Sequence, residues 1–168
     1  PVERPATGDE YPGYECFGYE RMMPKTNTEN PEVIQYFCKV GRYWLQEFDI
    51  DGWRLDVASE INDAFWRCFR TAVKEVKPDC LVWESAQHWL GGDMFDSTMN
   101  YDFRKHCRRF FAERSIDAAR FDGRVTNMRM RYKYNVLYGQ LNLLDSHDVS
   151  RFLSLCQLER ARMKLAVL

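Results

Sequence analysis

The stretch DGWRLDVA, residues 51–58, places an apolar side chain at every second position from Trp53 to Val57. Two charged residues, Arg54 and Asp56, fill the positions between them. Alternation with a period of two is typical of a β-strand that has one apolar and one polar face. We therefore predict a strand here with a charged face.

Helical patterns flank this strand on both sides. Before it, Asn30 is a suitable N-cap in front of a proline, and apolar residues then recur at three- and four-residue steps as far as Phe48. After it, Asn62 is a second candidate cap, and the apolar stripe that follows stops at Pro78. The apolar run 80–84 comes next, so the predicted order is helix, strand, helix, strand.

The remaining chain continues this alternation. We expect a third strand over 94–100, a helical region over 101–133 that breaks near Ser115, a fourth strand over 141–144 and an amphipathic helix over 158–168. Alternating strands and helices imply parallel strands. The fold class predicted is therefore α/β.

Carboxylates stand at the ends of three of these strands. Asp56 and Glu84 are 28 residues apart, and Glu84 and Asp148 are 64 apart. One strand–helix unit of a (β/α)8 barrel uses about 31 residues, so these spacings correspond to about one and two units. Parallel strands place their C-terminal ends on one side of the sheet. We therefore predict that the three carboxylates gather at one rim of a partial barrel.

Two of the carboxylates suit different roles in catalysis. Arg54 shares a strand face with Asp56, and its guanidinium would keep that carboxylate ionised and oriented. Glu84 follows a valine and a tryptophan, an apolar setting that would raise its pKa and keep its proton available. Such a pair, about 5 to 5.5 Å apart, is the arrangement of a retaining glycoside hydrolase. His147 and Asp148 would add hydrogen bonding and negative charge beside the transition state.

Each of these features also has an ordinary structural explanation. An arginine and an aspartate two apart on a strand are often only an ion pair, and a glutamate after an apolar strand is often only an exposed end. Residues 101–133 carry ten Lys and Arg against four acids. Because the acids are interleaved, a solvated helix face is favoured over a site for an anionic partner.

Composition excludes several classes of protein. The chain has 168 residues, 45% of them hydrophobic, and a formal net charge of −1. This size and apolar content suit one globular domain, and the charge balance argues against a nucleic-acid partner. No apolar run approaches the roughly 20 residues that span a membrane. The six cysteines include no C-x-x-C pair, which argues against a zinc site, and Cys38, Cys68 and Cys80 lie in apolar patterns that predict buried thiols.

Four motifs together resemble those of the α-amylase family of glycoside hydrolases. DGWRLDVA (51–58) resembles the family's nucleophile motif, VWE (82–84) its acid/base motif, and LLDSHD (143–148) its third-carboxylate motif. MPKTN (23–27) is similar to a motif of the neopullulanase, cyclomaltodextrinase and maltogenic amylase subgroup. The resemblance covers nearly the whole chain. It implies a partial (β/α)8 (TIM) barrel, roughly strands four to seven with their helices.

The resemblance also implies roles for individual residues. Asp56 would be the nucleophile, Glu84 the general acid/base and Asp148 the residue that stabilises the transition state. For substrate binding, Arg54 would position the nucleophile, His147 would bond sugar hydroxyls, and Ser59 and Glu60 would be subsite residues; no metal ligand is implied within this chain. The implied activity is retaining hydrolysis of α-glucosidic bonds in cyclodextrins, pullulan, starch or malto-oligosaccharides, with a share of transglycosylation.

The sequence departs from the family pattern at several points. Ser59 replaces the usual asparagine, Ser85-Ala86 replaces an aromatic-containing pair, and Thr26 replaces a leucine. These changes affect the expected substrate and linkage preference. The family's first motif, an aspartate and an Asn-His pair on the third strand, has no match here, and the first three strands and the eighth are absent.

The missing motif and strands predict a fragment of a longer protein, inactive and poorly stable alone. Residues 1–26 would be the end of a small inserted domain or a connecting segment, and 27–168 a partial barrel catalytic domain. For the full-length protein the resemblance allows calcium, a homodimer and a cytoplasmic location. The alternatives are an oligo-1,6-glucosidase or transglycosylase of the same family, or a non-catalytic fragment that serves as a carbohydrate-binding or interaction segment.

Overall fold

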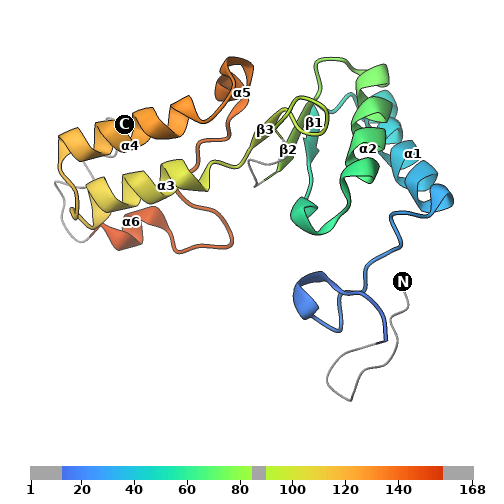
Figure 1. The fold of residues 1–168 in the computed structure, drawn as a ribbon, viewed down its shortest axis with the longest axis horizontal. Coiled ribbons are helices and arrows are strands. Elements are labelled where there is room, and N and C mark those ends of the chain that lie inside the picture. The colour runs from blue at the N-terminus through green and yellow to red at the C-terminus, as the bar shows by residue number, and fades with distance from the viewer. Residues whose placement is uncertain (1–12, 85–89, 157–168) are drawn as a thin grey trace. The chain divides into compact units, whose positions relative to one another are not determined.

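The computed structural model describes residues 13–84 and 90–156 (Figure 1). The chain forms two compact units. The first comprises Pro1–Glu84 and Gly91–Asp96, and the second comprises Ser85–Leu90 and Ser97–Leu168. The predicted helix over 158–168 lies outside the described residues.

Helix α1, Pro31–Phe48, confirms the first predicted helix in the first unit. The Asn30 side chain accepts a hydrogen bond from the Glu32 amide at 2.8 Å, which satisfies one of the free N–H groups of the first turn. Pro31 occupies the first helical position, where no amide hydrogen is required. The helix ends at Asp49, whose backbone is left-handed (φ 48°).

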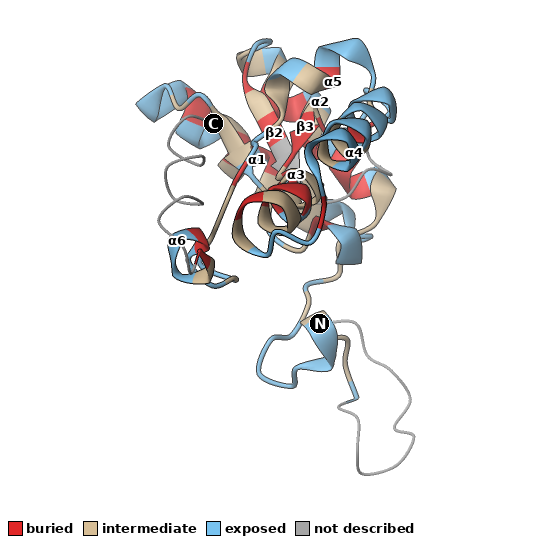
Figure 2. Ribbon diagram, turned by 90° about the vertical axis from the view of Figure 1, so that its left-hand side faces the viewer, coloured by how far each residue is buried: buried red, intermediate tan, exposed pale blue. Residues whose placement is uncertain are grey.

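Helix α2, Asp63–Val76, is capped by the predicted Asn62 and packs against α1 (Figure 1). Phe69 and Val73 of α2 are buried on this contact. A Cβ added at Gly41 of α1 would lie 2.8 Å from Cε2 of Phe69, so a larger residue there would push the helices apart. The buried positions of α2 and of the neighbouring strand form the core of this unit (Figure 2).

Two short parallel strands, β1 (Gly52–Arg54) and β2 (Leu81–Glu84), form the sheet of the first unit. Their register pairs Gly52 with Leu81 and Arg54 with Trp83. A Cβ at Gly52 would collide with the carbonyl oxygen of Leu81, so glycine permits this close pairing. The prediction that strand β1 extends to Val57 is wrong. The strand ends at Arg54, and Val57 takes a left-handed backbone (φ 48°) that does not fit a strand. The 3₁₀ turn η2, Ala58–Glu60, follows.

The second unit is mainly helical. Its elements are β3 (Ser97–Thr98), α3 (Tyr101–Cys107), the π-helical turn η4 (Arg108–Ala112), α4 (Ala118–Met130), α5 (Tyr134–Gly139) and α6 (Phe152–Leu155). Cys107, Phe111, Phe152 and Cys156 form its core cluster. The break near Ser115 is confirmed, since it separates η4 from α4. Helix α5 was not predicted.

The predicted third and fourth strands are wrong in extent. Only Ser97–Thr98 of the segment 94–100 is a strand, and within 141–144 only Leu141 pairs, in an isolated parallel bridge with Met99. A strand is defined by its hydrogen-bonded neighbour, and apolar pattern alone does not supply one.

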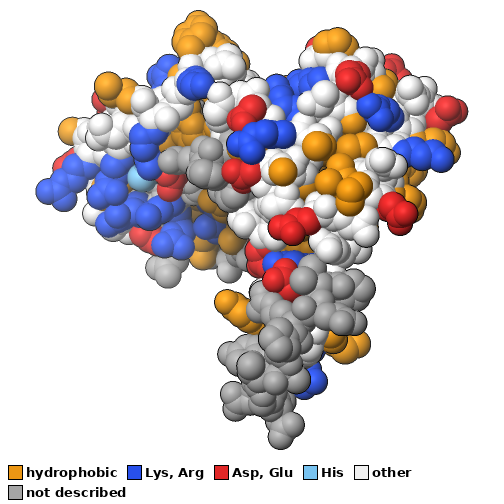
Figure 3. All heavy atoms as spheres, turned by 45° about the vertical axis from the view of Figure 1, so that its right-hand side comes forward, with side chains coloured by type: hydrophobic (Ala, Val, Ile, Leu, Met, Phe, Trp, Pro, Cys, Tyr) orange, Lys and Arg blue, Asp and Glu red, His pale blue; other side chains and the backbone are white. Residues whose placement is uncertain are grey.

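Most basic residues of 101–133 lie at the surface of the second unit, with acidic side chains among them (Figure 3), whereas Arg104 is buried. Arg108 Nε lies 2.8 Å from an oxygen of Glu113, and Arg131 Nη2 lies 3.0 Å from Oδ2 of Asp102. These exposed pairs agree with the solvated helix face that the interleaved charges predict.

Candidate active site

Arg54 and Asp56 are brought together at the C-terminal end of β1. Nη1 of Arg54 lies 2.8 Å from Oδ1 of Asp56. Arg54 is the last residue of the strand, whereas Asp56 lies in the turn that follows, so the contact forms although the strand is shorter than predicted. The Asp56 side chain is 70% exposed.

The turn after Asp56 is fixed by a buried hydrogen bond. Nε1 of Trp66 in α2 donates to the carbonyl oxygen of Ala58 at 2.9 Å, and Ala58 is fully buried. Val57 has positive φ, which is costly for a β-branched residue and persists only where the surroundings hold it. Asp56 thus lies at the start of a turn that a buried hydrogen bond to α2 fixes.

Glu84 closes β2, the strand paired in parallel with β1. Parallel pairing places the ends of the two strands at the same edge of the sheet, and neighbouring strands lie about 4.8 Å apart. The backbone of Glu84 is therefore beside the turn that carries Asp56. Its side chain lies outside the described residues, so its apolar setting and raised pKa stay predictions.

Asp96, which the sequence patterns did not single out, fixes β2 to α2. Its carboxylate lies 2.7 Å from Nη2 of Arg70 and 2.9 Å from Nζ of Lys74, and it accepts the Val82 amide at 3.1 Å. Burial opposes ionisation of this carboxyl, but the hydrogen bonds and charges of Arg70 and Lys74 outweigh it and hold the pKa of Asp96 below its ordinary value. This network sets the position of the strand that ends in Glu84.

We expect an Asp96→Asn variant to lose about 2 kcal/mol of unfolding free energy at neutral pH, because the half-buried cations lose their charged partner. A lowered folded-state pKa stabilises the fold above the ordinary aspartate pKa, and this contribution is lost as pH falls through the folded-state value. The difference between variant and wild type should therefore shrink in acid. Urea unfolding across a pH series measures it.

Asp93→Asn is the matched control, since Asp93 pairs with Arg67 at 2.7 Å but both side chains are 50% exposed. This variant should lose less than about 1 kcal/mol. Equal losses in the two variants would contradict the anchoring role of Asp96.

His147 and Asp148 lie in an exposed loop of the second unit. Nε2 of His147 is 3.3 Å from Oδ1 of Asp148, and their side chains are 74% and 56% exposed. The loop is fixed by two residues that sequence reasoning missed. Asp145 accepts the Phe152 amide at 2.9 Å, and the Ser146 hydroxyl lies 3.0 Å from the Tyr101 hydroxyl. The gathering of Asp148 with Asp56 and Glu84 at one rim stays a prediction.

The two predicted subsite residues after Val57 differ in their surroundings. Ser59 is exposed. Glu60 instead contacts the segment before α1: its Oε2 lies 2.7 Å from Nζ of Lys25, and it accepts the Gly18 amide. The hydrogen bond from Lys25, assisted by the Gly18 amide, outweighs partial burial and lowers the pKa of Glu60.

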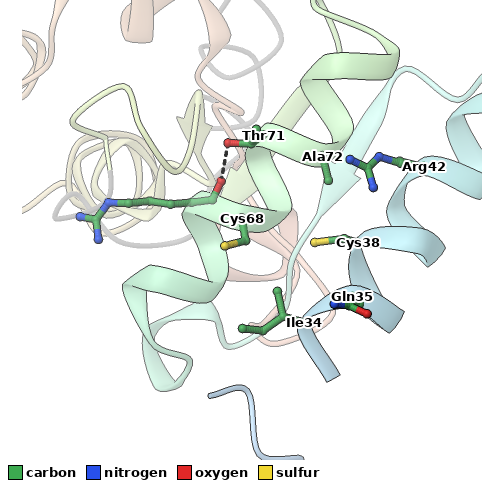
Figure 4. A pocket seen from close by; sticks show the side chains of 8 residues that line it. Ile34, Gln35, Cys38, Arg42, Cys68, Thr71 and Ala72 are labelled. Carbon is green, nitrogen blue, oxygen red and sulfur yellow. Dashed lines mark hydrogen bonds between the residues drawn. The ribbon is translucent and has the colours of Figure 1, made fainter. Parts of the chain in front are cut away.

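A separate groove lies between α1 and α2 and contains none of the predicted site residues (Figure 4). Cys38 and Cys68 line it from opposite helices, and all six cysteines are free thiols. Burial raises the pKa of Cys38, which suits an inert packing residue. The prediction that Cys68 is buried is wrong, because it faces the open groove; Cys80 is buried as predicted.

Within the described ranges, 13–84 and 90–156, two features are absent. No group of three or more His, Cys, Asp or Glu residues there is placed to hold a metal ion. No helix in these ranges has the length and apolar character needed to cross a membrane.

The chain is similar to known proteins whose names all denote enzymes that act on α-glucans. The chain is 51% identical over 160 residues to "Neopullulanase 2" of Thermoactinomyces vulgaris, covering 92% of this chain and 27% of the relative. It is 44% identical over 168 residues to "Intracellular maltogenic amylase" of Bacillus subtilis, covering 96% and 28%. A solved structure named "Cyclomaltodextrinase" superposes with a TM-score of 0.89 at 40% identity, over 99% of this chain and 30% of that one. The chain thus spans less than a third of the length of these relatives.

Residues 8–168, which are most of the chain, match the family described as "Alpha amylase, catalytic domain". In this chain the parallel strands β1 and β2 alternate with helices, as the α/β class requires. The chain therefore belongs to the α-amylase family.

Proposed function

We propose that the protein carrying this chain is a retaining glycoside hydrolase that cleaves α-glucosidic bonds of cyclodextrins, pullulan, starch or malto-oligosaccharides, with a share of transglycosylation. The observation that carries the proposal is the Arg54–Asp56 contact of 2.8 Å at the end of β1, beside the strand that ends in Glu84. The names of the relatives, a neopullulanase, a maltogenic amylase and a cyclomaltodextrinase, support this substrate class.

In the proposed first step, a carboxylate oxygen of Asp56 attacks the anomeric carbon of the glucosyl unit. The bond from that carbon to the leaving oxygen breaks, and Glu84 donates its proton to that oxygen. A covalent glycosyl ester of Asp56 results. Arg54 orients Asp56 through the contact of 2.8 Å between Nη1 and Oδ1.

In the second step, Glu84, now a carboxylate, removes a proton from water. The hydroxide equivalent attacks the anomeric carbon and releases Asp56. A sugar hydroxyl in place of water gives transglycosylation. Asp148 would stabilise the positive charge that develops on the ring, and His147, its neighbour at 3.3 Å, would bind sugar hydroxyls.

The proposal includes a place for this chain within the barrel. Residues 27–168 would supply roughly strands four to seven with their helices, and residues 1–26 would be the end of an inserted small domain or a connecting segment. Superposition on less than a third of a solved relative supports a partial domain. The homodimer belongs to the proposal for the full-length protein, as does the cytoplasmic location, which the name of the B. subtilis relative supports.

An activity assay with stereochemical readout tests the proposal. The longest form of the protein that carries this chain is incubated with β-cyclodextrin, pullulan and starch, and the anomeric proton of the first product is followed by NMR. We expect the α-anomer to appear first and the β-anomer only by later mutarotation. Initial release of the β-anomer would contradict the retaining mechanism, and no release by a folded protein would favour a non-catalytic role.

A further inference from the structure

Residues 14–25 form a closed loop in front of α1. Cys16 and Pro24 make an antiparallel bridge, and the amide of Lys25 donates to the carbonyl oxygen of Glu15 at 2.9 Å. The 3₁₀ turn η1, Phe17–Tyr19, lies inside the loop, directly after Cys16. We call residues 14–25 the N-terminal loop.

The Glu60 carboxylate links this loop to the turn that follows Asp56. Its two oxygens lie 3.1 and 3.2 Å from the amide nitrogen of Gly18, and Oε2 lies 2.7 Å from Nζ of Lys25. Lys25 is held in turn, since its Nζ lies 5.1 Å from the centre of the Phe17 ring and its side chain is only 14% exposed. Glu60 thus contacts the loop at the turn η1 and at its last residue, Lys25.

These contacts change the role expected of Glu60. A carboxylate only accepts hydrogen bonds, and both oxygens of Glu60 already accept from the loop. At Oε2 of Glu60 a sugar hydroxyl would have to compete with the charged donor of Lys25, and charge-assisted hydrogen bonds are the stronger ones. Direct sugar binding through Oε2 of Glu60 is therefore disfavoured.

The loop itself offers a surface suited to a sugar. Tyr19 and Met22 are 76% and 86% exposed, and Met23 is also exposed. An aromatic ring is a flat apolar surface on which the apolar face of a pyranose ring stacks, and the two methionines add flexible apolar area beside it. Such a surface contributes to binding only if the loop is held in one position, because ordering a mobile loop costs conformational entropy.

We propose that Glu60 is a positioning residue. It holds the N-terminal loop beside the turn that carries Asp56, so that the exposed Tyr19 and Met22 of the loop bind the glucan chain. The inference rests on the proposed function for the identity of the ligand. Glu60 and Lys25 act as one unit, and they affect binding of the substrate rather than bond cleavage.

We call the contacts of Glu60 with Lys25 and with the Gly18 amide the clamp. Hydrogen exchange of the protein without substrate tests it. In Glu60→Gln and in Lys25→Met, amides of the N-terminal loop should exchange about tenfold faster, the size of effect expected for one lost hydrogen bond to a charged group. Glu75→Gln is the matched control, because it removes the same charge from the exposed Arg42–Glu75 pair of 2.7 Å. Unchanged exchange of the loop in Glu60→Gln would overturn the proposal.

Kinetics on β-cyclodextrin and starch then separate positioning from direct binding. The clamp predicts that KM rises severalfold in both single variants while kcat is kept, and that the double variant is no worse than either. A raised KM in Glu60→Gln alone, or additive effects, would identify Glu60 as a direct sugar ligand and overturn the clamp. If the wild type hydrolyses neither substrate, the proposed function fails, whereas the clamp is still decided by hydrogen exchange.

Discussion

An Asp56→Asn variant is expected to lose at least about 10⁴-fold in kcat on cyclodextrin and starch. The neutral amide cannot form the glycosyl ester, and its shape is nearly that of the carboxylate, so the turn between β1 and α2 should be preserved. The fold should tolerate the change, because the Asp56 side chain is mostly exposed and its partner Arg54 lies at the surface as well. Steady-state kinetics at saturating substrate measure the effect.

Asp79→Asn serves as the control for Asp56→Asn, because Asp79 is exposed in the turn before β2 and is remote from the proposed chemistry. This variant should keep wild-type kcat and KM. An Asp56→Asn protein that unfolds like the wild type and retains more than a tenth of its kcat would remove Asp56 from the role of nucleophile.

A Glu84→Gln variant is expected to lose about 10²- to 10⁴-fold in activity, but only on substrates whose leaving group needs a proton. A sugar hydroxyl is a poor leaving group, so hydrolysis of starch should fall strongly. Fluoride leaves without protonation, so the first step with α-maltosyl fluoride should remain fast. Comparing the two substrates by pre-steady-state kinetics isolates the acid role.

The same variant tests the base role of Glu84. Azide needs no deprotonation, so it should intercept the glycosyl ester of Asp56 and release an α-glycosyl azide. The wild type, in contrast, should give mainly hydrolysis. Equal losses on starch and on the fluoride, with no azide product, would mean that Glu84 is not the acid/base.

Local signals in the sequence predicted the helices of the first unit well. Asn30 and Asn62 are side chains that satisfy free amides of the first helical turn, and such capping depends only on neighbours in the chain. The Arg54–Asp56 contact was predicted from alternation along a strand, and it forms although Asp56 lies in the turn after β1 and not on the strand. Capping and alternation are short-range properties.

The strands and the supporting residues could not be predicted to the same extent. Strand length depends on a partner far away in sequence, and the left-handed backbone of Val57 has no signal in a run of alternating residues. Asp96 meets Arg70 and Lys74 only after α2 has packed on β2, so no local pattern marks it. Glu60 was expected at a sugar subsite, and its contact with Lys25 spans 35 positions of the chain.

Trapping of the covalent intermediate tests the central claim, that Asp56 is the nucleophile of a retaining hydrolase. The protein carrying this chain is incubated with 5-fluoro-α-glucosyl fluoride, a substrate that forms the glycosyl ester faster than water removes it, and its peptides are analysed by mass spectrometry. We predict one fluoroglucosyl unit per protein, attached to Asp56. A label on another residue, or continued turnover of starch with no label at all, would contradict the account.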